Sequence, residues 1–300
     1  MLMNKTLLAV DGMAYVFRAY YAVPYICSHD GIPTNAVFGF HQLLQIMLEE
    51  VEPDYLAVAF DLSGPTFREE AYSDYKANRP EPPNDLLEQI PIVKEYLRAM
   101  GVPILEKQGY EADDILATMA KRAKAQGVKT LIATGDKDLC QLVDDDIFIL
   151  RSSMRDMRIL DAGGVKREYG VWPNQIIDYL TIVGDSSDNV PGVKGIGVKG
   201  ARELLENYEG LDKIYASLDS LPNSQRKKLE EALDHIENSR FLITICCDVP
   251  IECEVGTLKR REGDPGAIKD FCAKYDFQSI TGGGRKAPKE DDAPQQQELF

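Results

Sequence analysis

Acidic residues with the pattern of a metal site begin in the segment GYEADDILATMA, residues 109–120. This segment places Glu111, Asp113 and Asp114 just ahead of an apolar helical stripe, where the partial positive charge of a helix N-terminus also favours acids. These carboxylates cannot share one helix face, so they can meet only at the open end of the helix. Similar acids follow short apolar runs or open helices elsewhere, and the full set is Asp11, Asp61, Glu111, Asp113, Asp114, Asp136, Asp138, Asp185 and Asp188.

Each of these nine acids has an ordinary alternative interpretation as a helix cap or turn former. Together they predict a site for hard divalent cations, because unpaired carboxylates in one cleft repel each other and take up protons. Oxygen-only ligation favours Mg²⁺ or Mn²⁺. The three histidines are scattered, and the six cysteines form no CxxC pair with histidines at zinc spacing. This pattern argues against zinc and indicates reduced thiols in a cytosolic protein.

The elements that must position these acids alternate along the chain. We predict three buried strands, each an apolar run ending in an acid, at residues 6–12, 54–61 and 128–139. Between them we predict helices at residues 13–22, 35–51, 84–100 and 111–126. This alternation predicts an α/β fold with a mostly parallel central sheet flanked by helices. Ligands of such sheets bind beyond the carboxyl ends of the strands, where Asp11, Asp61, Asp136 and Asp138 would lie.

Two parts of the chain depart from this alternation. Residues 62–83 form a charged and aromatic insertion between a strand and a helix, and loops of that length in compact domains are usually functional or disordered. Strand signals fade from about residue 163, and we predict helices to about residue 238. We therefore expect an α/β domain at 1–162, a helical subdomain at 163–280 and a flexible tail at 281–300.

The segment GIGVKG, residues 195–200, matches GxGxxG but has no predicted strand before it. It therefore does not fit a dinucleotide-binding turn, and no GK[ST] follows to complete a P-loop. We predict a tight glycine hairpin between two helices within about 174–208, the second helix starting near residue 198. Such a hairpin exposes backbone N–H groups to a phosphate, beside Lys194 and Lys199. A plain helix–helix turn is the alternative.

The net charge of −15 argues against a nucleic-acid partner, because phosphate contacts need Lys and Arg. Removing the nine acids would change −15 to −6, and two divalent ions would offset four more charges. The remaining surface is mildly acidic, so local patches must provide any grip on nucleic acid. No apolar stretch approaches the roughly eighteen residues of a membrane span, and the N-terminal apolar run is too short for a signal peptide.

Longer motifs resemble, in order, those of the 5′ nuclease family of the flap endonuclease type, especially the 5′→3′ exonuclease domain at the front of bacterial DNA polymerase I. They are LAVDG, VAFD, FREEAYSDYKANRP, GYEADDILA, ATGDKDLCQL and GDSSDNVPGVKGIGVKGARELL. The resemblance covers residues 5–280. It implies a PIN-like α/β fold, a helical arch at 62–83 and a C-terminal helix–three-turn–helix element. It also implies metal-dependent hydrolysis of phosphodiesters at 5′ ends, flaps and displaced RNA or DNA, in replication and repair.

The resemblance implies roles for individual residues. Asp11, Asp61 and Glu111 would hold one ion and Asp136, Asp138 and Asp185 a second, with Asp113 and Asp114 between them and Asp188 outermost. Lys76 and Arg79 would steer the scissile phosphate as catalytic residues, Tyr75 would stack on a base, and Arg18 would contact a further phosphate. The hairpin at 192–200 would hold K⁺ and grip branched or nicked duplex DNA through Gly192, Lys194, Gly195, Gly197 and Lys199.

The chain has no room for polymerase or proofreading domains, so we expect a stand-alone nuclease, a monomer of the bacterial cytoplasm at the nucleoid. The final QQELF resembles the bacterial sliding-clamp-binding pentapeptide, with Gln296 first, Leu299 and Phe300 last, and Gln297 where that motif usually has leucine. Two other functions stay open, a catalytically silent DNA-junction-binding paralogue recruited by the clamp and an RNA-processing nuclease. The presence of all nine acids with Lys76 and Arg79 favours an active enzyme.

Overall fold

The apolar runs assemble into one six-stranded sheet in the computed structural model of the chain, which describes residues 5–277. The strands lie in the order β3-β2-β1-β4-β5-β6, and all neighbours pair in parallel except β5 and β6. Their bounds are β1 Thr6–Asp11, β2 Tyr55–Ala59, β3 Ile104–Leu105, β4 Lys129–Ala133, β5 Ile147–Ser152 and β6 Met157–Leu160. The predicted mostly parallel sheet is confirmed. The tail at 281–300, with Gln296, Leu299 and Phe300, lies outside the described residues.

The three predicted strands are present, but the sequence did not predict β3, β5 and β6. Strand β3 has only two residues, too few for any periodic signal. Strand β6 presents an exposed middle and pairs antiparallel with β5, so its residues lack the continuous apolar run of a buried parallel strand. The third predicted strand ends at Ala133 rather than continuing to residue 139, because residues 138–142 form a 3-10 turn.

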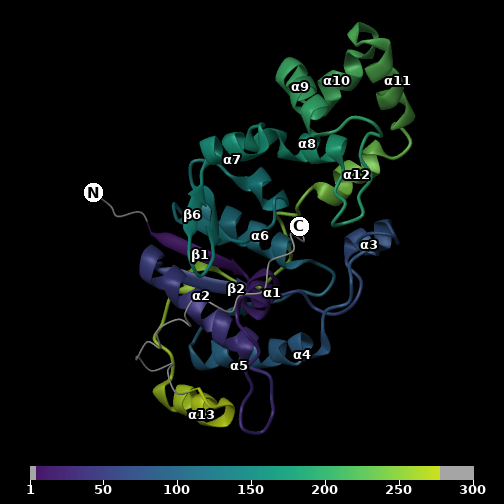
Figure 1. The fold of residues 1–300 in the computed structure, drawn as a ribbon. Coiled ribbons are helices and arrows are strands. Elements are labelled where there is room, and N and C mark those ends of the chain that lie inside the picture. Colours follow the sequence, from purple (N-terminus) through teal and green to yellow (C-terminus); the bar gives the residue numbers. More distant parts are fainter. Residues whose placement is uncertain (1–4, 278–300) are drawn as a thin grey trace.

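Helices cover both faces of the sheet, and β1 shows why (Figure 1). Its side chains alternate, so Leu7 and Ala9 join one apolar core while Leu8 and Val10 join the other. The second of these cores lies under four helices, α1 Gly12–Ala22, α2 Asn35–Val51, α5 Gln89–Ala99 and α13 Pro265–Tyr275. Helix α6, Ala112–Ala125, covers the opposite face. The α/β body is therefore a three-layer arrangement that buries its strands on both sides.

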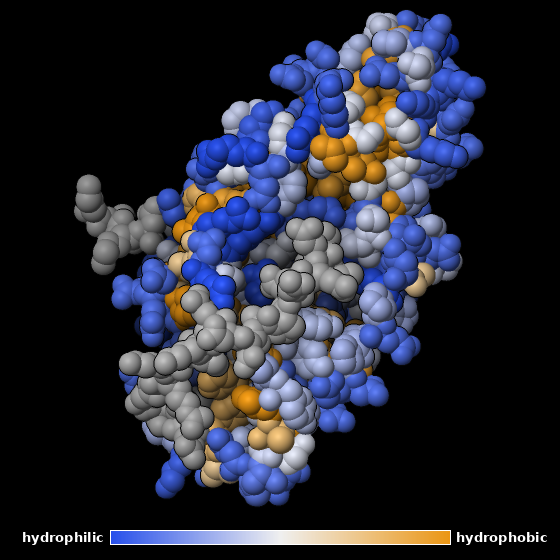
Figure 2. All heavy atoms as spheres, viewed as in Figure 1, coloured by the Kyte–Doolittle hydropathy of each residue, from blue (hydrophilic) through white to orange (hydrophobic). Residues whose placement is uncertain are grey.

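The region from residue 162 is helical, as predicted, and forms the upper part of the molecule in Figure 1. It comprises α7 Ala162–Tyr169, α8 Ile176–Val183, α9 Val198–Tyr208, α10 Leu211–Ala216, α11 Asn223–Glu231 and α12 Ile236–Ile243, with 3-10 turns at Pro173–Gln175, Leu218–Ser220 and Val255–Leu258. In Figure 2 this part shows apolar atoms between its helices on an otherwise hydrophilic face. Its buried residues continue the core that contains Leu7.

Helix α13 differs from the expected assignment of residues 163–280 to the helical subdomain. Phe271 and Tyr275 pack with α5 on the far face of the sheet, so the chain returns to the α/β body after α12. In the part of the chain that the structure describes, no helix is both long and apolar enough to cross a lipid bilayer.

The insertion at 62–83 contains one short helix, α3 Phe67–Ala71, followed by turns. A capping box fixes its start, because Thr66 accepts a hydrogen bond from the Glu69 N–H and the Glu69 carboxylate accepts one from the Thr66 N–H. The helix predicted at 84–100 is split into α4 Asn84–Leu87 and α5 by Glu88.

The predicted glycine hairpin joins α8 to α9, and α9 begins at the expected residue, Val198. Asp185 and Val190 exchange two backbone hydrogen bonds of 2.9 and 2.7 Å, which close residues 185–190 into a compact loop. Gly184 and Gly192 then pass backbone against backbone, with Gly184 at φ +81°. A side chain on either glycine would push the loop out of place.

We predict that Gly192→Ala lowers the free energy of unfolding by about 1–3 kcal/mol, because an added Cβ would lie 2.4 Å from Gly184 N. Gly197→Ala on the same hairpin is the control, since a Cβ there meets no atom within 4 Å, and should cost less than about 1 kcal/mol. Urea unfolding of both variants measures this. Equal losses would contradict the close approach at Gly192.

Candidate metal centre

Adjacent strands bring three of the predicted acids to one edge of the sheet. Asp11 is the last residue of β1, Asp61 follows β2 and Asp136 follows β4, and β1 lies between the other two strands. Asp11 caps α1 by accepting the Ala14 N–H at 3.0 Å and also accepts the Thr134 hydroxyl at 3.0 Å. Asp61 accepts the Ala112 N–H at 2.8 Å, which ties the β2 end to the start of α6. The sheet topology therefore gathers these carboxylates as predicted.

The first turn of α6 adds three more acids at the same edge. Glu111 is the N-cap residue, and Asp113 and Asp114 follow in the first turn. Among the described residues, Asp113 Oδ1 is buried and has no hydrogen-bond partner. Asp114 is fully buried, and both of its oxygens accept hydrogen bonds from the Arg68 guanidinium at 2.8 Å. The adjacent acids of this segment thus have different surroundings.

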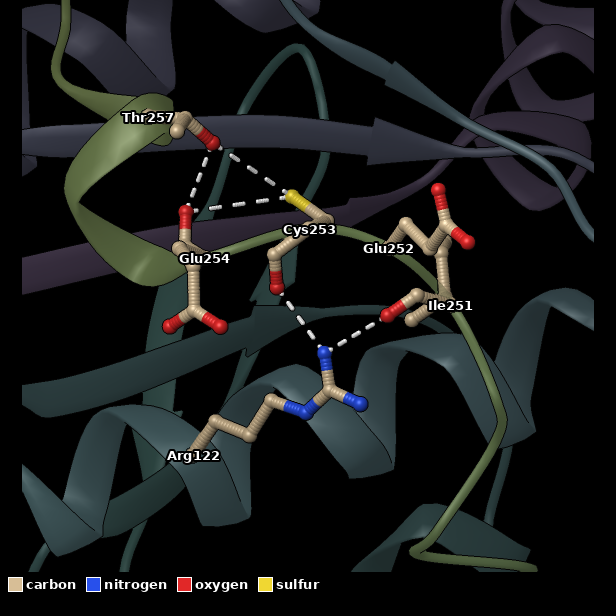
Figure 3. Close-up of a pocket in the computed structure, with 6 residues that line it drawn as sticks. All are labelled: Arg122, Ile251, Glu252, Cys253, Glu254 and Thr257. Atoms are coloured by element: carbon tan, nitrogen blue, oxygen red, sulfur yellow. Dashed lines mark hydrogen bonds between the residues drawn. The ribbon is translucent and has the colours of Figure 1, made fainter.

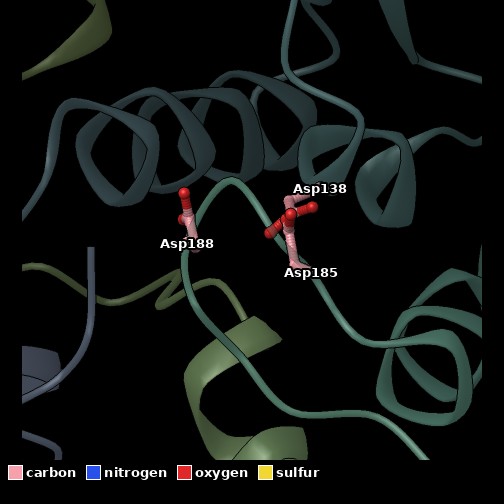
Figure 4. A group of neighbouring side chains, drawn as sticks. All are labelled: Asp138, Asp185 and Asp188. Carbon is pink, nitrogen blue, oxygen red and sulfur yellow. The ribbon is translucent and has the colours of Figure 1, made fainter. Parts of the chain in front are cut away.

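A third group lies where the loop 185–190 meets the 3-10 turn after β4. Asp138, Asp185 and Asp188 each offer one carboxylate oxygen, and these oxygens lie within 4.8 Å of one another. Figure 4 shows Asp138 and Asp185 pointing toward each other, with Asp188 on the other limb of the loop. Asp138 Oδ1 is buried and lacks a partner among the described residues. This spacing suits shared ligation of one cation.

Mutual repulsion links the groups into one cluster. Burial, and then the charges of Asp61 and Asp136, raise the pKa of Asp11 to about 6. Burial followed by repulsion from Asp136 raises the pKa values of Asp113 and Asp138 well above the usual range. The pKa of Asp136 is also raised, by burial and by the charges of Asp188 and Asp185. Carboxylates this close stay ionised at neutral pH only if positive charge arrives.

Four basic side chains contact the nine acids in the described part of the chain. Arg68 pairs with Glu111 and Asp114, Lys76 with Glu111, Arg79 with Asp188, and Lys137 with Asp185. Burial alone would raise the pKa of Asp185, but hydrogen bonds from Ser187 and the positive charge of Lys137 outweigh this effect and lower it. Within residues 5–277, Asp11, Asp61, Asp113, Asp136 and Asp138 have no ion pair with a basic side chain.

The contacts of Arg68 argue against the expected role of Asp114 as a ligand between two ions. Its guanidinium bonds Asp114 and Glu111 and also donates to the carbonyls of Leu242 and Thr244 at 2.9 Å, so every N–H has an acceptor. Asp114 also accepts the N–H groups of Glu111 and Cys246. Asp114 is therefore a structural anchor with no free oxygen toward a metal, because a buried guanidinium needs this full complement of acceptors.

Tyr75 and Arg18 differ from the expectation of open contacts with nucleic acid. Tyr75 is only 5% exposed, and its hydroxyl donates to Asp188 at 3.0 Å and approaches Glu111 at 3.3 Å. No face of its ring is available for a base in this conformation. The Arg18 guanidinium donates to the Ser152 carbonyl and lies against the Tyr15 ring, so it is partly engaged within the protein.

Most of the predicted DNA-binding residues of the hairpin are exposed. Lys194, Gly195, Gly197 and Lys199 are exposed, whereas Gly192 is half-buried against Gly184. The Gly195 carbonyl accepts the Lys228 ammonium at 2.9 Å. The hairpin therefore has two exposed lysines near the start of α9, whose N-cap residue, Gly197, has no side chain to cap it.

Sequence reasoning missed Arg68, Lys137 and Thr134 as parts of the acid cluster. Lys137 lies between two of the predicted acids, so its position in GDKD was a usable signal. Arg68 lies more than forty residues before its carboxylate partner Asp114, and only the tertiary fold brings them together.

A hollow beside the C-terminal half of α6 is separate from the acids. Figure 3 shows Arg122 donating to the carbonyls of Ile251 and Cys253 in its wall, at 2.9 and 2.8 Å. Arg122 also donates to the Val249 carbonyl. These bonds fix the returning chain onto α6, so the hollow serves packing and contains none of the predicted site residues.

The acid cluster fits a hard divalent cation. Its donors are carboxylate oxygens alone, and two of them, on Asp113 and Asp138, are buried without any hydrogen-bond partner among the described residues. Buried polar atoms are rarely left unpaired, so such oxygens indicate a missing positive partner. No histidine or cysteine belongs to the set, which matches the preference of Mg²⁺ or Mn²⁺.

Protein-family models match most of the chain. The model described as "5'-3' exonuclease, N-terminal resolvase-like domain" matches residues 6–170, and the model described as "5'-3' exonuclease, C-terminal SAM fold" matches residues 171–266. The boundary falls after α7, a few residues beyond the expected division at 162.

Similar proteins include a shorter nuclease and much longer polymerases. The "5'-3' exonuclease" of Aquifex aeolicus is 36% identical over 92% of this chain and 94% of its own length. "DNA polymerase I" of Caldicellulosiruptor bescii is 41% identical over 91% of this chain but 33% of its own length, and that of Bacillus subtilis is 40% identical over 85% and 29%. The chain thus spans about a third of the polymerases that it matches.

Solved structures share the fold at low identity. A "T5 5'-exonuclease" with bound zinc superposes with a TM-score of 0.67 at 21% identity, over 90% of this chain and 98% of that one. Human GEN1 in complex with Holliday junction DNA superposes with a TM-score of 0.57 at 13% identity, over 91% and 68%. The matched family models and the Aquifex relative together show that this chain belongs to the 5′-3′ exonuclease family of nucleases.

Proposed function

We propose that the chain hydrolyses phosphodiesters at 5′ ends and 5′ flaps of DNA and of RNA primers, in replication and repair, with divalent metal bound at the acid cluster. The observation that carries this proposal is the convergence of carboxylates from three adjacent strand ends, the first turn of α6 and the loop 185–190. The buried unpartnered oxygens of Asp113 and Asp138 support it. A silent paralogue would have no need to keep such strongly repelling acids together.

Two groups of carboxylates would hold Mg²⁺ or Mn²⁺. Asp11, Asp61, Asp113 and Asp136 have oxygens on the sheet edge, while Asp138, Asp185 and Asp188 share the second group. Glu111 would lie beside them through its contacts with Arg68 and Lys76. When bound, divalent cations supply Lewis-acid stabilisation of the negative charge that develops on the phosphodiester.

Lys76 and Arg79 would act as catalytic residues on the scissile phosphate. Both lie in the insertion and contact Glu111 and Asp188, so their positive charges are at the metal cluster already. Positive groups close to where negative charge develops on the phosphate lower the barrier to reaction. Arg18 on α1 would contact a phosphate farther along the strand, and Tyr75 would reach a base only after leaving its buried position.

The α8–α9 hairpin would bind the backbone of branched or nicked duplex DNA as a helix–hairpin–helix element. Gly192 keeps the turn compact, Gly195 adopts a φ of +81°, and Gly197 is the N-cap residue of α9. Lys194 and Lys199 add positive charge beside the N-terminus of α9. Such contacts select structure rather than base sequence. K⁺ at residues 192–200 receives less support, because the Lys228 ammonium already contacts the Gly195 carbonyl.

The chain would act as a monomer in the bacterial cytoplasm, close to the nucleoid. Its partner would be the bacterial sliding clamp, bound through Gln296, Leu299 and Phe300 of the QQELF sequence. Two large apolar residues at the end of a polar segment suit insertion into a hydrophobic groove. Clamp binding would bring the nuclease to junctions left by a polymerase.

Asp136→Asn should reduce cleavage by about a hundredfold or more, because the amide keeps the shape of the carboxylate but removes a charge from the cluster. Wild type and variant are compared with Mg²⁺ on 5′-labelled flap, nicked and single-stranded substrates. Asp156→Asn is the matched control, an exposed aspartate in the β5–β6 turn that should leave rates unchanged. No flap cleavage by wild type would overturn the proposed activity, and full cleavage by Asp136→Asn would overturn the ligand assignment.

Metal should stabilise the protein more strongly as pH rises. The pKa of Asp11 in the folded protein is raised to about 6. At low pH, proton binding to Asp11 therefore stabilises the metal-free folded state, and this stabilisation is lost as the pH rises through about 6. Protons and Mg²⁺ compete for the same oxygens. The stabilisation on adding saturating Mg²⁺ to EDTA-treated protein should therefore be larger at pH 8 than at pH 5, by about 1.4 kcal/mol of unfolding free energy for the single proton on Asp11.

Thermal unfolding at several pH values, with NaCl matched for ionic strength, measures this difference. Taking the Mg²⁺ effect at each pH removes the contributions of acids outside the cluster. An effect of Mg²⁺ that is constant with pH, or larger at pH 5, would contradict proton competition at Asp11.

Deleting Leu299 and Phe300 should abolish retention of the protein on immobilised sliding clamp while leaving cleavage of free flap DNA unchanged. The prediction follows because these are the apolar residues of the proposed clamp motif and lie far along the chain from the acids. Pull-down and flap assays on the same preparations test it. Unchanged retention would remove the clamp from the proposal.

A further inference from the structure

Hydrogen bonds hold the turn segment 74–79 of the insertion against the loop 185–190, and we call these contacts the latch. Two asparagines make neutral contacts between them, since Asn189 Nδ2 donates to the Asp74 carbonyl at 2.7 Å and Asn78 Nδ2 donates to the Ser186 carbonyl at 2.6 Å. The Lys76 N–H also donates to the Asp188 carbonyl at 3.0 Å. Backbone and side-chain contacts thus hold the insertion against the same loop that supplies two of the candidate ligands.

This latch places basic and hydroxyl groups on carboxylate oxygens of the cluster. Lys76 contacts Glu111 Oε1 at 2.5 Å, while Tyr75 donates to Asp188 Oδ2 and Arg79 pairs with Asp188 Oδ1. Both oxygens of Asp188 are therefore engaged by the insertion. A cation that binds the group Asp138, Asp185 and Asp188 would therefore lie next to the positive charge of Arg79 and compete with it for Asp188.

The latch also holds its backbone in uncommon conformations. Lys76 has φ +58° and Asn189 has φ +56°, in the left-handed region. Asparagine tolerates this region, but lysine does so at a cost of about 1 kcal/mol or more. The contacts of Lys76 with Glu111 and Asp188 offset this cost, so their loss favours a different position of the segment.

We propose that segment 74–79 is an internal counter-ion of the metal site, latched by Asn78 and Asn189, which divalent metal displaces on binding. The proposal rests on the proposed metal centre. Lys76 and Arg79 neutralise Glu111 and Asp188 before metal arrives, and metal takes over these carboxylates because it carries twice the charge. The released lysine and arginine are then free to meet the phosphate, so metal loading and presentation of the catalytic cations become one event.

Limited trypsin digestion tests the displacement directly. In EDTA the Lys76–Ala77 bond should be protected, because Lys76 is paired and its side chain is only 22% exposed. Mg²⁺ should accelerate cleavage there roughly tenfold, since proteolysis follows the population of the released segment. Cleavage after Arg155, in the exposed turn between β5 and β6, is the internal control and should not change. Equal or slower cleavage after Lys76 in Mg²⁺ would overturn the proposal.

Weakening the latch without changing charge gives a second measurement. The variant Asn78→Ala with Asn189→Gly removes both amide contacts, and glycine keeps the backbone at φ +56° free of strain. Calorimetric titration of metal-free protein should show Mg²⁺ binding about fivefold or more tighter than in wild type, as expected for two lost hydrogen bonds. Asn207→Ala is the matched control, since this exposed asparagine donates only within α9.

The two failures are distinguishable. If wild type shows no heat of Mg²⁺ binding, the metal centre itself is wrong. If wild type binds Mg²⁺ but the double variant binds it with equal or lower affinity, the metal centre stands and the displaced latch does not. Circular dichroism of the variants verifies that each remains folded.

Discussion

Crowding of negative charge at one edge of the sheet is the constraint to which the rest of the structure responds. Strands β2, β1 and β4 are neighbours, so the acids at their ends must meet, and α6 adds its own first-turn acids at the same place. Burial and repulsion raise the pKa values of Asp11, Asp113, Asp136 and Asp138 together. A protein gains no stability from such an arrangement. The proposed metal binding would account for its presence, because divalent cations would relieve the same repulsion.

Arg68 reduces this loss of stability at Asp114, where a buried carboxylate needs a positive partner. Asp114 has no exposed surface, and an unpaired carboxylate there would destabilise the protein by several kcal/mol, on the order of 3–5. The guanidinium neutralises Asp114 and also bonds the carbonyls of Leu242 and Thr244, so one side chain joins the insertion, α6 and the end of α12. The guanidinium that neutralises Asp114 therefore also fixes the helical part against the α/β body.

The sequence predicted the parts of the site that depend on chain order and missed those that depend on packing. Acids at strand ends follow from the parallel topology, and the glycine hairpin follows from its local residues, so both could be predicted. Nothing local distinguishes Asp114 from Asp113, because the difference is made by Arg68 from a distant segment. Tyr75 has the composition of a stacking residue, but the loop 185–190 encloses it. Strand β6 was missed because it is a short strand at the edge of the sheet with an exposed middle, without the continuous apolar run of a buried strand.

The loop 185–190 joins the acid cluster to the hairpin that precedes α9. Gly184 joins it to α8, it supplies Asp185 and Asp188 to the acid cluster, and the chain continues through Gly192 into the hairpin before α9. The close passage of Gly184 and Gly192 leaves little freedom between the acids and the hairpin. A duplex held by the hairpin would therefore lie at a fixed distance from the metal ligands. If the hairpin and the acids act as proposed, this connection would favour substrates in which a strand leaves the duplex at that distance and reaches the acids.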